Sequence, residues 1–104
     1  MPLDQFRLSI LDNNATFLKE NIDCENGLLE YMVQKGALTE RQVDHIHTHQ
    51  NRSEALLGII RRGKRKQYDM TAEALKASNQ ENIADVLING GGKHVLFIIA
   101  ENND

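Results

Sequence analysis

Basic side chains concentrate in one short segment of this sequence. Five of the six positions from 61 to 66 (RRGKRK) are Arg or Lys, although the chain of 104 residues has a formal net charge of −3. From Arg52 to Lys66, six basic residues stand against one acid, a local charge of +5 that leaves −8 for the remainder. Such a cluster can bind a nucleic acid, serve in nuclear import or dock onto an acidic protein surface. It can also be a solvated helix end, where cations suit the helix dipole.

The overall charge helps to choose among these interpretations. Nucleic-acid-binding domains usually have a basic balance and a basic face, whereas this chain is acidic outside one segment. A protein with one basic and one acidic surface can attract complementary copies or partners. We therefore favour docking onto a protein. A nucleic-acid site at 61–66 is the alternative, although Tyr68 is the one aromatic residue close enough to stack a base.

The segment HIHTH at 45–49 raises the question of a metal site. His45 and His49 are four residues apart and would share one face of a helix. Zinc needs three or four ligands, and Cys24 is the single cysteine of the chain. We expect exposed histidines at a helix end and no metal or other cofactor. A catalytic pair of Cys24 with a histidine would need an orienting group and a pocket, so we expect no enzyme activity.

The elements that carry these residues have helical spacing through the first ninety positions. Apolar residues recur at intervals of three and four within six segments, around 3–22, 28–33, 43–46, 56–60, 68–75 and 83–87. TERQ at 39–42 has the form of a capping box, Asn51 with Glu54 repeats that form, and Gly36 can end a helix. We predict an all-α fold, a six-helix antiparallel bundle with short turns.

The first predicted helix should be bent. DNN at 12–14 lies in its middle, and Asp and Asn side chains compete for backbone hydrogen bonds. The inward stripe of this helix is expected to contain Leu3, Phe6, Ile10, Leu11, Ala15, Leu18 and Ile22. The common core of the bundle is expected to contain Leu28, Leu57, Leu75, Ile83 and Leu87.

Length and cysteine content suggest one domain in a reducing compartment. We expect the helical bundle to occupy residues 1–91; residues 92–104 could extend the last helix, form a strand or dock as a tail. A single cysteine excludes an internal disulfide framework. No leader opens the sequence, and its longest apolar run, VLFIIA at 95–100, is far shorter than the ~18 residues of a membrane span. The expectation is a cytoplasmic protein.

Two stretches resemble a caspase recruitment domain (CARD) of the death-fold superfamily. Residues 27–46, GLLEYMVQKGALTERQVDHI, resemble the helix–turn–helix with the Leu-Leu and Gly-x-Leu-Thr pattern of that family. Residues 56–87 resemble its basic-glycine turn, the helix ending in Ala-Leu, and the final x-x-(Leu/Ile)-Ala-x-x-Leu. The likeness covers residues 3–89, and it rests on the order and spacing of these motifs together. It implies a death fold.

The resemblance also implies a function. CARDs are non-catalytic adaptor domains that recruit other CARD-containing proteins, such as caspases, adaptors or scaffolds, in apoptotic or innate immune signalling. A basic face on the first and fourth helices commonly meets an acidic face on the second and third. The basic positions here are Arg7, Arg52, Arg61, Arg62, Lys64 and Arg65. The acidic positions are Glu25, Glu30, Glu40 and Asp44. A chain with both faces could also self-associate, and a bundle without any partner surface is the plainest alternative.

Overall fold

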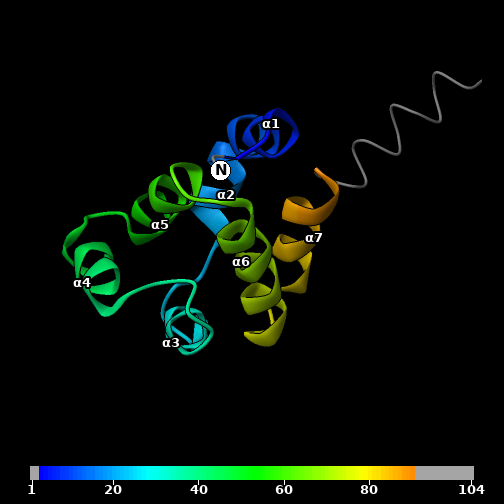
Figure 1. Cartoon of the computed structure of the whole chain (residues 1–104). Helices are drawn as coiled ribbons and strands as arrows, with labels where there is room; N and C mark the ends of the chain where they lie inside the picture. Colours follow the sequence, from blue (N-terminus) through cyan, green and yellow to red (C-terminus); the bar gives the residue numbers. More distant parts are fainter. Residues whose placement is uncertain (1–2, 91–104) are drawn as a thin grey trace, which may run out of the picture.

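The computed structural model describes residues 3–90, and the regular structure in this range is helical, without strands (Figure 1). The helices are α1 (Gln5–Asn13), α2 (Ala15–Asn21), α3 (Leu28–Gln34), α4 (Glu40–Thr48), α5 (Arg52–Arg61), α6 (Arg65–Ala77) and α7 (Glu81–Asn89). The predicted all-α class is therefore confirmed for these residues. Helices α1 and α2 correspond to the predicted bent first helix, and α3 to α7 to the other five. The expectation for residues 92–104 lies outside the described range.

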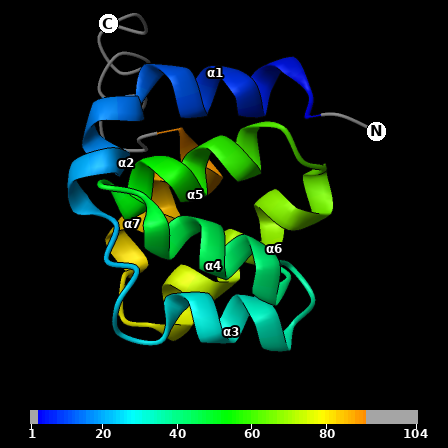
Figure 2. The ribbon, with the colours of Figure 1, turned by 90° about the vertical axis from the view of Figure 1, so that its left-hand side faces the viewer.

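The bend between α1 and α2 occurs at Asn14. Its backbone and side-chain amides both donate to the carbonyl oxygen of Ile10, at 3.0 and 2.9 Å. Its φ of −115° departs from the helical value of about −63°. An Asn side chain that bonds to the backbone one turn earlier competes with regular helix. The predicted bend within 12–14 is confirmed, and Figure 2 shows the two helices meeting at an angle.

Local capping signals fix the ends of several helices. At the start of α4, the Gln42 amide donates to the Thr39 hydroxyl at 3.1 Å, and the Thr39 amide donates to the Gln42 side chain at 3.0 Å. The Asn51 side chain accepts from the Glu54 amide at the start of α5. Gly36 has a φ of +76° just beyond α3, a conformation that glycine adopts readily. These are the predicted capping positions.

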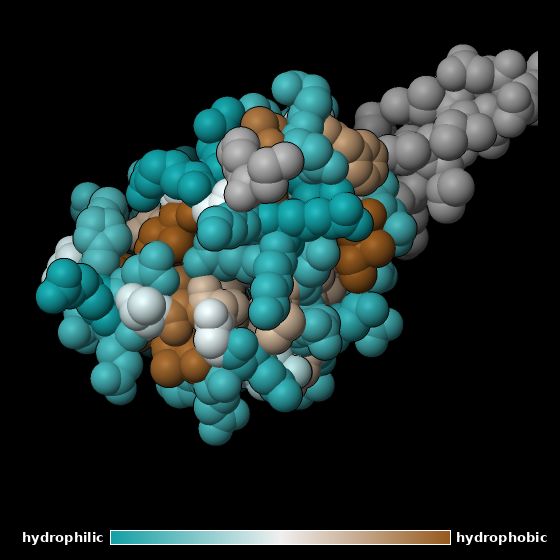
Figure 3. Space-filling model, viewed as in Figure 1, coloured by the Kyte–Doolittle hydropathy of each residue, from teal (hydrophilic) through white to brown (hydrophobic). Residues whose placement is uncertain are grey.

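The helices pack into one globule around a shared core. Helix α6 packs against α7 and α3, while α5 packs against α2 and α4, and α1 lies against α7 and α5. In the view of Figure 2, α1 lies at one end and α3 at the other, with α4 and α5 between them. Figure 3 shows that hydrophilic residues cover most of one face, with apolar residues confined to small patches.

Four of the five predicted core residues are buried. These are Leu28, Leu75, Ile83 and Leu87. The fifth, Leu57, is only partly buried and packs against the edge of the core, whereas the neighbouring Leu56 is completely buried. The buried positions of α5 also include Ala55 and Ile59, which centre the inward face of the helix on the side of Leu56 and away from Leu57. Leu57 lies about 100° around the helix axis from Leu56 and so faces the margin.

Two expected positions on the first helix are also corrected. Phe6 is 60% exposed, and Ala15 is exposed as well. Arg7 and Leu8 occupy the half-buried positions one turn before the buried Ile10 and Leu11, so Phe6 falls on the solvent side of α1. Ala15 follows the bend at Asn14, where the helical phase changes. The rest of the predicted stripe is buried, namely Leu3, Ile10, Leu11, Leu18 and Ile22.

Polar side chains join segments that are distant in the sequence. The buried Tyr68 hydroxyl donates to the carbonyl oxygen of Leu87 at 2.8 Å, which ties α6 to α7. The Ser53 hydroxyl donates to the carbonyl oxygen of Ile22 at 2.7 Å. The Gln80 side chain accepts from the backbone amide of Asp23 and donates to its carbonyl oxygen, at 2.7 and 2.8 Å. Satisfied buried polar groups of this kind fix the relative position of the elements.

Candidate interaction surfaces

Three of the four predicted acidic positions lie together in one open groove between α3 and α4. We call this site the acidic groove; it has a volume of about 480 Å³ and is lined by Leu29, Glu30, Val33, Gln34, Glu40, Val43, Asp44 and His47. Leu29 is buried, and Val33 and Val43 are half-buried, so the floor is apolar. A cationic side chain with an aliphatic stem would match both the floor and the rim.

The sequence positions these three carboxylates through two helix starts. Glu30 belongs to the first turn of α3, and Glu40 is the first residue of α4, directly after the Thr39 cap. Asp44 is four residues after Glu40, so the two share one helix face. All three side chains are exposed, and none takes part in an ion pair within the part of the chain that the structure describes. The groove therefore presents three carboxylates that are not engaged in ion pairs within the described residues.

Glu25, the fourth predicted acid, lies elsewhere and has a partner of its own. It precedes α3 in the loop from 22 to 27, where its carboxylate pairs with the guanidinium of Arg52, the first residue of α5. Sequence reasoning placed these two residues on opposite docking faces. The structure brings them together across 27 positions of the chain. The two side chains therefore partly neutralise each other within the molecule.

Arg61 is held in a similar way. Its guanidinium donates two hydrogen bonds to the Asp12 carboxylate, at 3.0 and 3.1 Å, and so joins α5 to α1. This hydrogen bonding holds the pKa of Asp12 below its ordinary value of 3.8. A two-pronged Arg–carboxylate pair has a defined geometry, although such exposed pairs contribute little stability. Sequence analysis did not single out Asp12, because its partner is 49 positions away.

Arg7 and Arg65 meet at a shared carboxylate. Arg7 is the more enclosed, with 17% of its side chain exposed; it pairs with Asp4 at 2.9 Å and with Asp69 at 3.5 Å. Its guanidinium also lies 5.6 Å from the centroid of the Tyr68 ring. The more exposed Arg65 pairs with Asp69 at 3.6 Å, one turn along α6. Arg7 is thus mainly a brace between α1 and α6, and Arg65 remains accessible.

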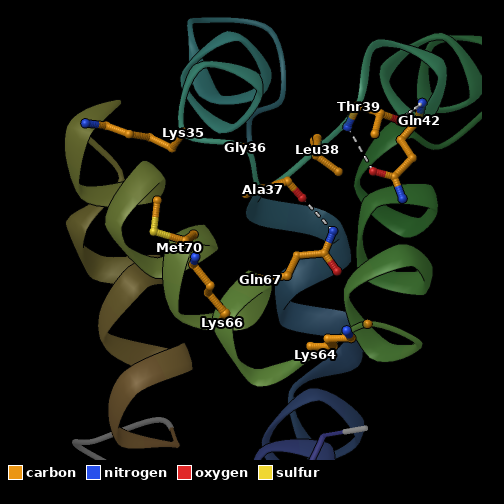
Figure 4. Close-up of a pocket in the computed structure, with 11 residues that line it drawn as sticks. Lys35, Gly36, Ala37, Leu38, Thr39, Gln42, Lys64, Lys66, Gln67 and Met70 are labelled. Atoms are coloured by element: carbon orange, nitrogen blue, oxygen red, sulfur yellow. Dashed lines mark hydrogen bonds between the residues drawn. The ribbon is translucent and has the colours of Figure 1, made fainter. Parts of the chain in front are cut away.

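Of the six Lys and Arg residues without an ion-pair partner in the described range, three lie at the turn from α5 to α6. Arg62, Lys64 and Lys66 are exposed, and no carboxylate of residues 3–90 pairs with them. Lys64 and Lys66 line a pocket with Lys35, which comes from the end of α3. We call this site the lysine pocket; its other lining residues are Gly36, Ala37, Leu38, Thr39, Gln42, Gly63, Gln67 and Met70 (Figure 4). Sequence reasoning missed Lys35.

Cys24 and the histidines do not assemble into a nucleophilic or metal site in the described residues. Cys24 and His49 line the same shallow hollow, but burial raises the pKa of the Cys24 thiol to about 11. A nucleophilic cysteine requires the opposite change. His45 and His49 are exposed, with ring centroids 4.7 Å apart. Between residues 3 and 90, no three His, Cys, Asp or Glu side chains are grouped as metal ligands.

Comparisons with family models, curated proteins and solved structures found no match to this chain. None of the helices within the described range is long and apolar enough to cross a membrane.

Proposed function

We propose that this chain is a non-catalytic recruitment domain of the CARD type, which binds another CARD-containing protein in apoptotic or innate immune signalling. The motifs at 27–46 and 56–87 support this proposal, as does an all-α globule whose helices follow the expected order. The observation that carries it is the acidic groove. Glu30, Glu40 and Asp44 come from two helices and converge on one accessible surface with an apolar floor.

The complementary surface is the exposed part of the basic cluster. Arg62 and Arg65 flank the turn from α5 to α6 and are exposed. Arg62 has no ion-pair partner in the described residues, and Arg65 has a 3.6 Å pair with Asp69 on its own helix, whereas Arg52 and Arg61 are paired with carboxylates of other segments. Arg62 lies back over Gly58, with a guanidinium nitrogen 3.5 Å from the position that a Cβ would take there. Opposed charged patches speed encounter and fix the register of two proteins. Raising the salt concentration should weaken the association, because the Debye length shortens from ~10 Å at 0.1 M to ~3 Å at 1 M.

Charge reversal on each surface tests this proposal. Arg62→Glu with Arg65→Glu, or Glu40→Lys with Asp44→Lys, should reduce association by at least tenfold in light scattering or a pull-down with CARD partners. The matched controls are Lys76→Glu and Asp85→Lys, which change exposed residues elsewhere on α6 and α7. Mixing the two double variants should restore a pair, since each retains one intact surface. If the double variants and the controls bind CARD partners equally well, charge docking is wrong.

The alternative, nucleic-acid binding by residues 61–66, has weaker support. Tyr68 is 2% exposed and its hydroxyl is bonded to Leu87, so its ring cannot stack a base. Loss of RNA or DNA binding in the Arg62→Glu, Arg65→Glu variant, together with normal recruitment of CARD partners, would favour this alternative.

A further inference from the structure

The lysine pocket has a composition unlike the rest of this acidic chain. Three of its eleven lining residues are lysines and none is Asp or Glu, although the whole sequence has more acids than bases. Its volume is about 530 Å³, within the usual range for small-molecule sites. Three exposed ammonium groups with no carboxylate among the lining residues create a positive potential that an anion can neutralise.

A glutamine brace holds the two segments that supply these lysines. The Gln67 side-chain nitrogen donates to the carbonyl oxygen of Ala37 at 2.6 Å, which joins the start of α6 to the loop after α3 (Figure 4). Gly63 makes this conformation possible. A Cβ at position 63 would lie 1.9 Å from Oε1 of Gln67, so any other residue would displace the brace.

The helix that begins at the pocket adds to the positive potential. Thr39 caps the amides at the start of α4, whereas α6 begins after Lys64 with no side-chain cap. The positive end of the α6 dipole therefore lies beside Lys64 and Lys66. In the structure, the Lys35 ammonium lies 5.5 Å from the centroid of the Tyr31 ring. To join Lys64 and Lys66 at a bound anion, the Lys35 ammonium must leave this ring, a change that its flexible four-carbon stem permits.

We propose that the lysine pocket binds a small polyphosphate, a ligand with two or three linked phosphate groups. Three point-like ammonium groups suit phosphate oxygens, which need no planar, two-pronged partner of the arginine type. No aromatic residue lines the pocket, so the phosphate chain is the recognised part and a nucleobase would gain no stacking. The pocket shares Lys64 with the predicted basic face. The inference can still be tested apart from the proposed recruitment function, because the lysines changed in its test, Lys35 and Lys66, belong to neither docking face.

Calorimetric titration of the full chain tests the inference. With tripolyphosphate as the probe, binding should be at least tenfold tighter than with sulfate at the same ionic strength. Replacing Lys35 and Lys66 by Ala should weaken tripolyphosphate binding at least tenfold. The control replaces Lys19 and Lys76, which removes equal charge outside the pocket and should change binding less than twofold. Equal losses in both double variants, or no preference over sulfate, would overturn the proposal.

Two further measurements separate a built pocket from general attraction to charge. Gly63→Ala retains every lysine but displaces the Gln67 brace, so tripolyphosphate binding should weaken severalfold; unchanged binding would contradict the role of the brace. ATP, which has the same linked phosphates plus a base, should bind no more tightly than tripolyphosphate. A single-stranded oligonucleotide that binds more tightly, and loses binding with Arg62→Glu and Arg65→Glu, would identify an extended nucleic-acid surface instead of this pocket.

Discussion

The acidic groove and the lysine pocket are neighbours with opposite charge, separated by the first turn of α4. Thr39 and Gln42 line the pocket, whereas Glu40 and Val43 line the groove. Lys and Arg are absent from the residues lining the groove, just as Asp and Glu are absent from those lining the pocket. The comparison teaches that pairing within the fold decides which charged side chains remain available to a partner. The number of neighbouring cations in the sequence does not.

The capping box explains how one turn can divide the two sites. Reciprocal hydrogen bonds between Thr39 and Gln42 occupy the pocket side of the turn. Glu40, the residue after Thr39, is the first residue of α4, and it lines the groove. Asp44 lines the groove one turn later in the same helix. The same box thus fixes the start of α4, one wall of the pocket and one rim of the groove.

The largest expected effect comes from removing the core that supports both sites. Leu56→Ala should lower the free energy of unfolding by about 2–5 kcal/mol, because Leu56 is completely buried. Leu57→Ala is the matched control on the same helix, and it should cost less than half as much since Leu57 is half-buried. Urea denaturation followed by circular dichroism measures both values. Equal costs would mean that the assigned phase of α5 is wrong.

A smaller and sharper effect is expected at the turn between the two sites. Thr39→Ala removes the cap of α4 and should lower the free energy of unfolding by about 1 kcal/mol. It should also weaken both tripolyphosphate binding and CARD association by severalfold, although no charge is removed. Thr39→Ser, which retains the hydroxyl, is the control and should keep both activities. A loss confined to one activity would show that the two sites do not depend on the same turn.

The smallest effect is expected at the internally paired part of the basic cluster. The pKa of Asp12 is lowered by Arg61, so the pair stabilises the fold above the ordinary pKa of 3.8, and this contribution is lost as the pH falls through the lower folded-state value. Asp12→Asn should therefore flatten the acid side of the profile of melting temperature against pH. It should leave tripolyphosphate binding unchanged, because Arg61 lies outside the lysine pocket. A marked gain in that binding would mean that all cations of the cluster act together.

Features governed by near neighbours were predictable from the sequence. The bend at Asn14, the cap at Thr39 and the helix end at Gly36 each follow from residues within one turn. The shallower burial of Leu57 was not predictable in this way, because two adjacent leucines leave the helical phase undecided until the neighbouring helices are known. The alternatives at 56 and 57 differ by one position, which the apolar spacing alone does not resolve.

The charged surfaces were predictable only in part, because some of their residues are brought together from distant positions in the sequence. Glu40 and Asp44 share a helix face through local spacing, whereas Glu30 belongs to α3 and joins them only because the fold places α3 beside the groove. In contrast, the pairing of Arg61 with Asp12 depends on packing across 49 positions, and the sequence has no local trace of it. Lys35 was missed for the same reason, since only the fold brings it beside the turn at Lys64.

The two hydrogen bonds between the Gln80 side chain and the Asp23 backbone have a consequence for the order in which the chain folds during synthesis. They join positions 57 residues apart, at the junction that precedes α7. A growing chain emerges from the ribosome at about 5–20 residues per second, so Asp23 waits several seconds for its partner. During that interval Tyr68 also lacks its acceptor on Leu87. The N-terminal helices can form early, but the bundle closes late, when nearly all the described residues have been synthesised.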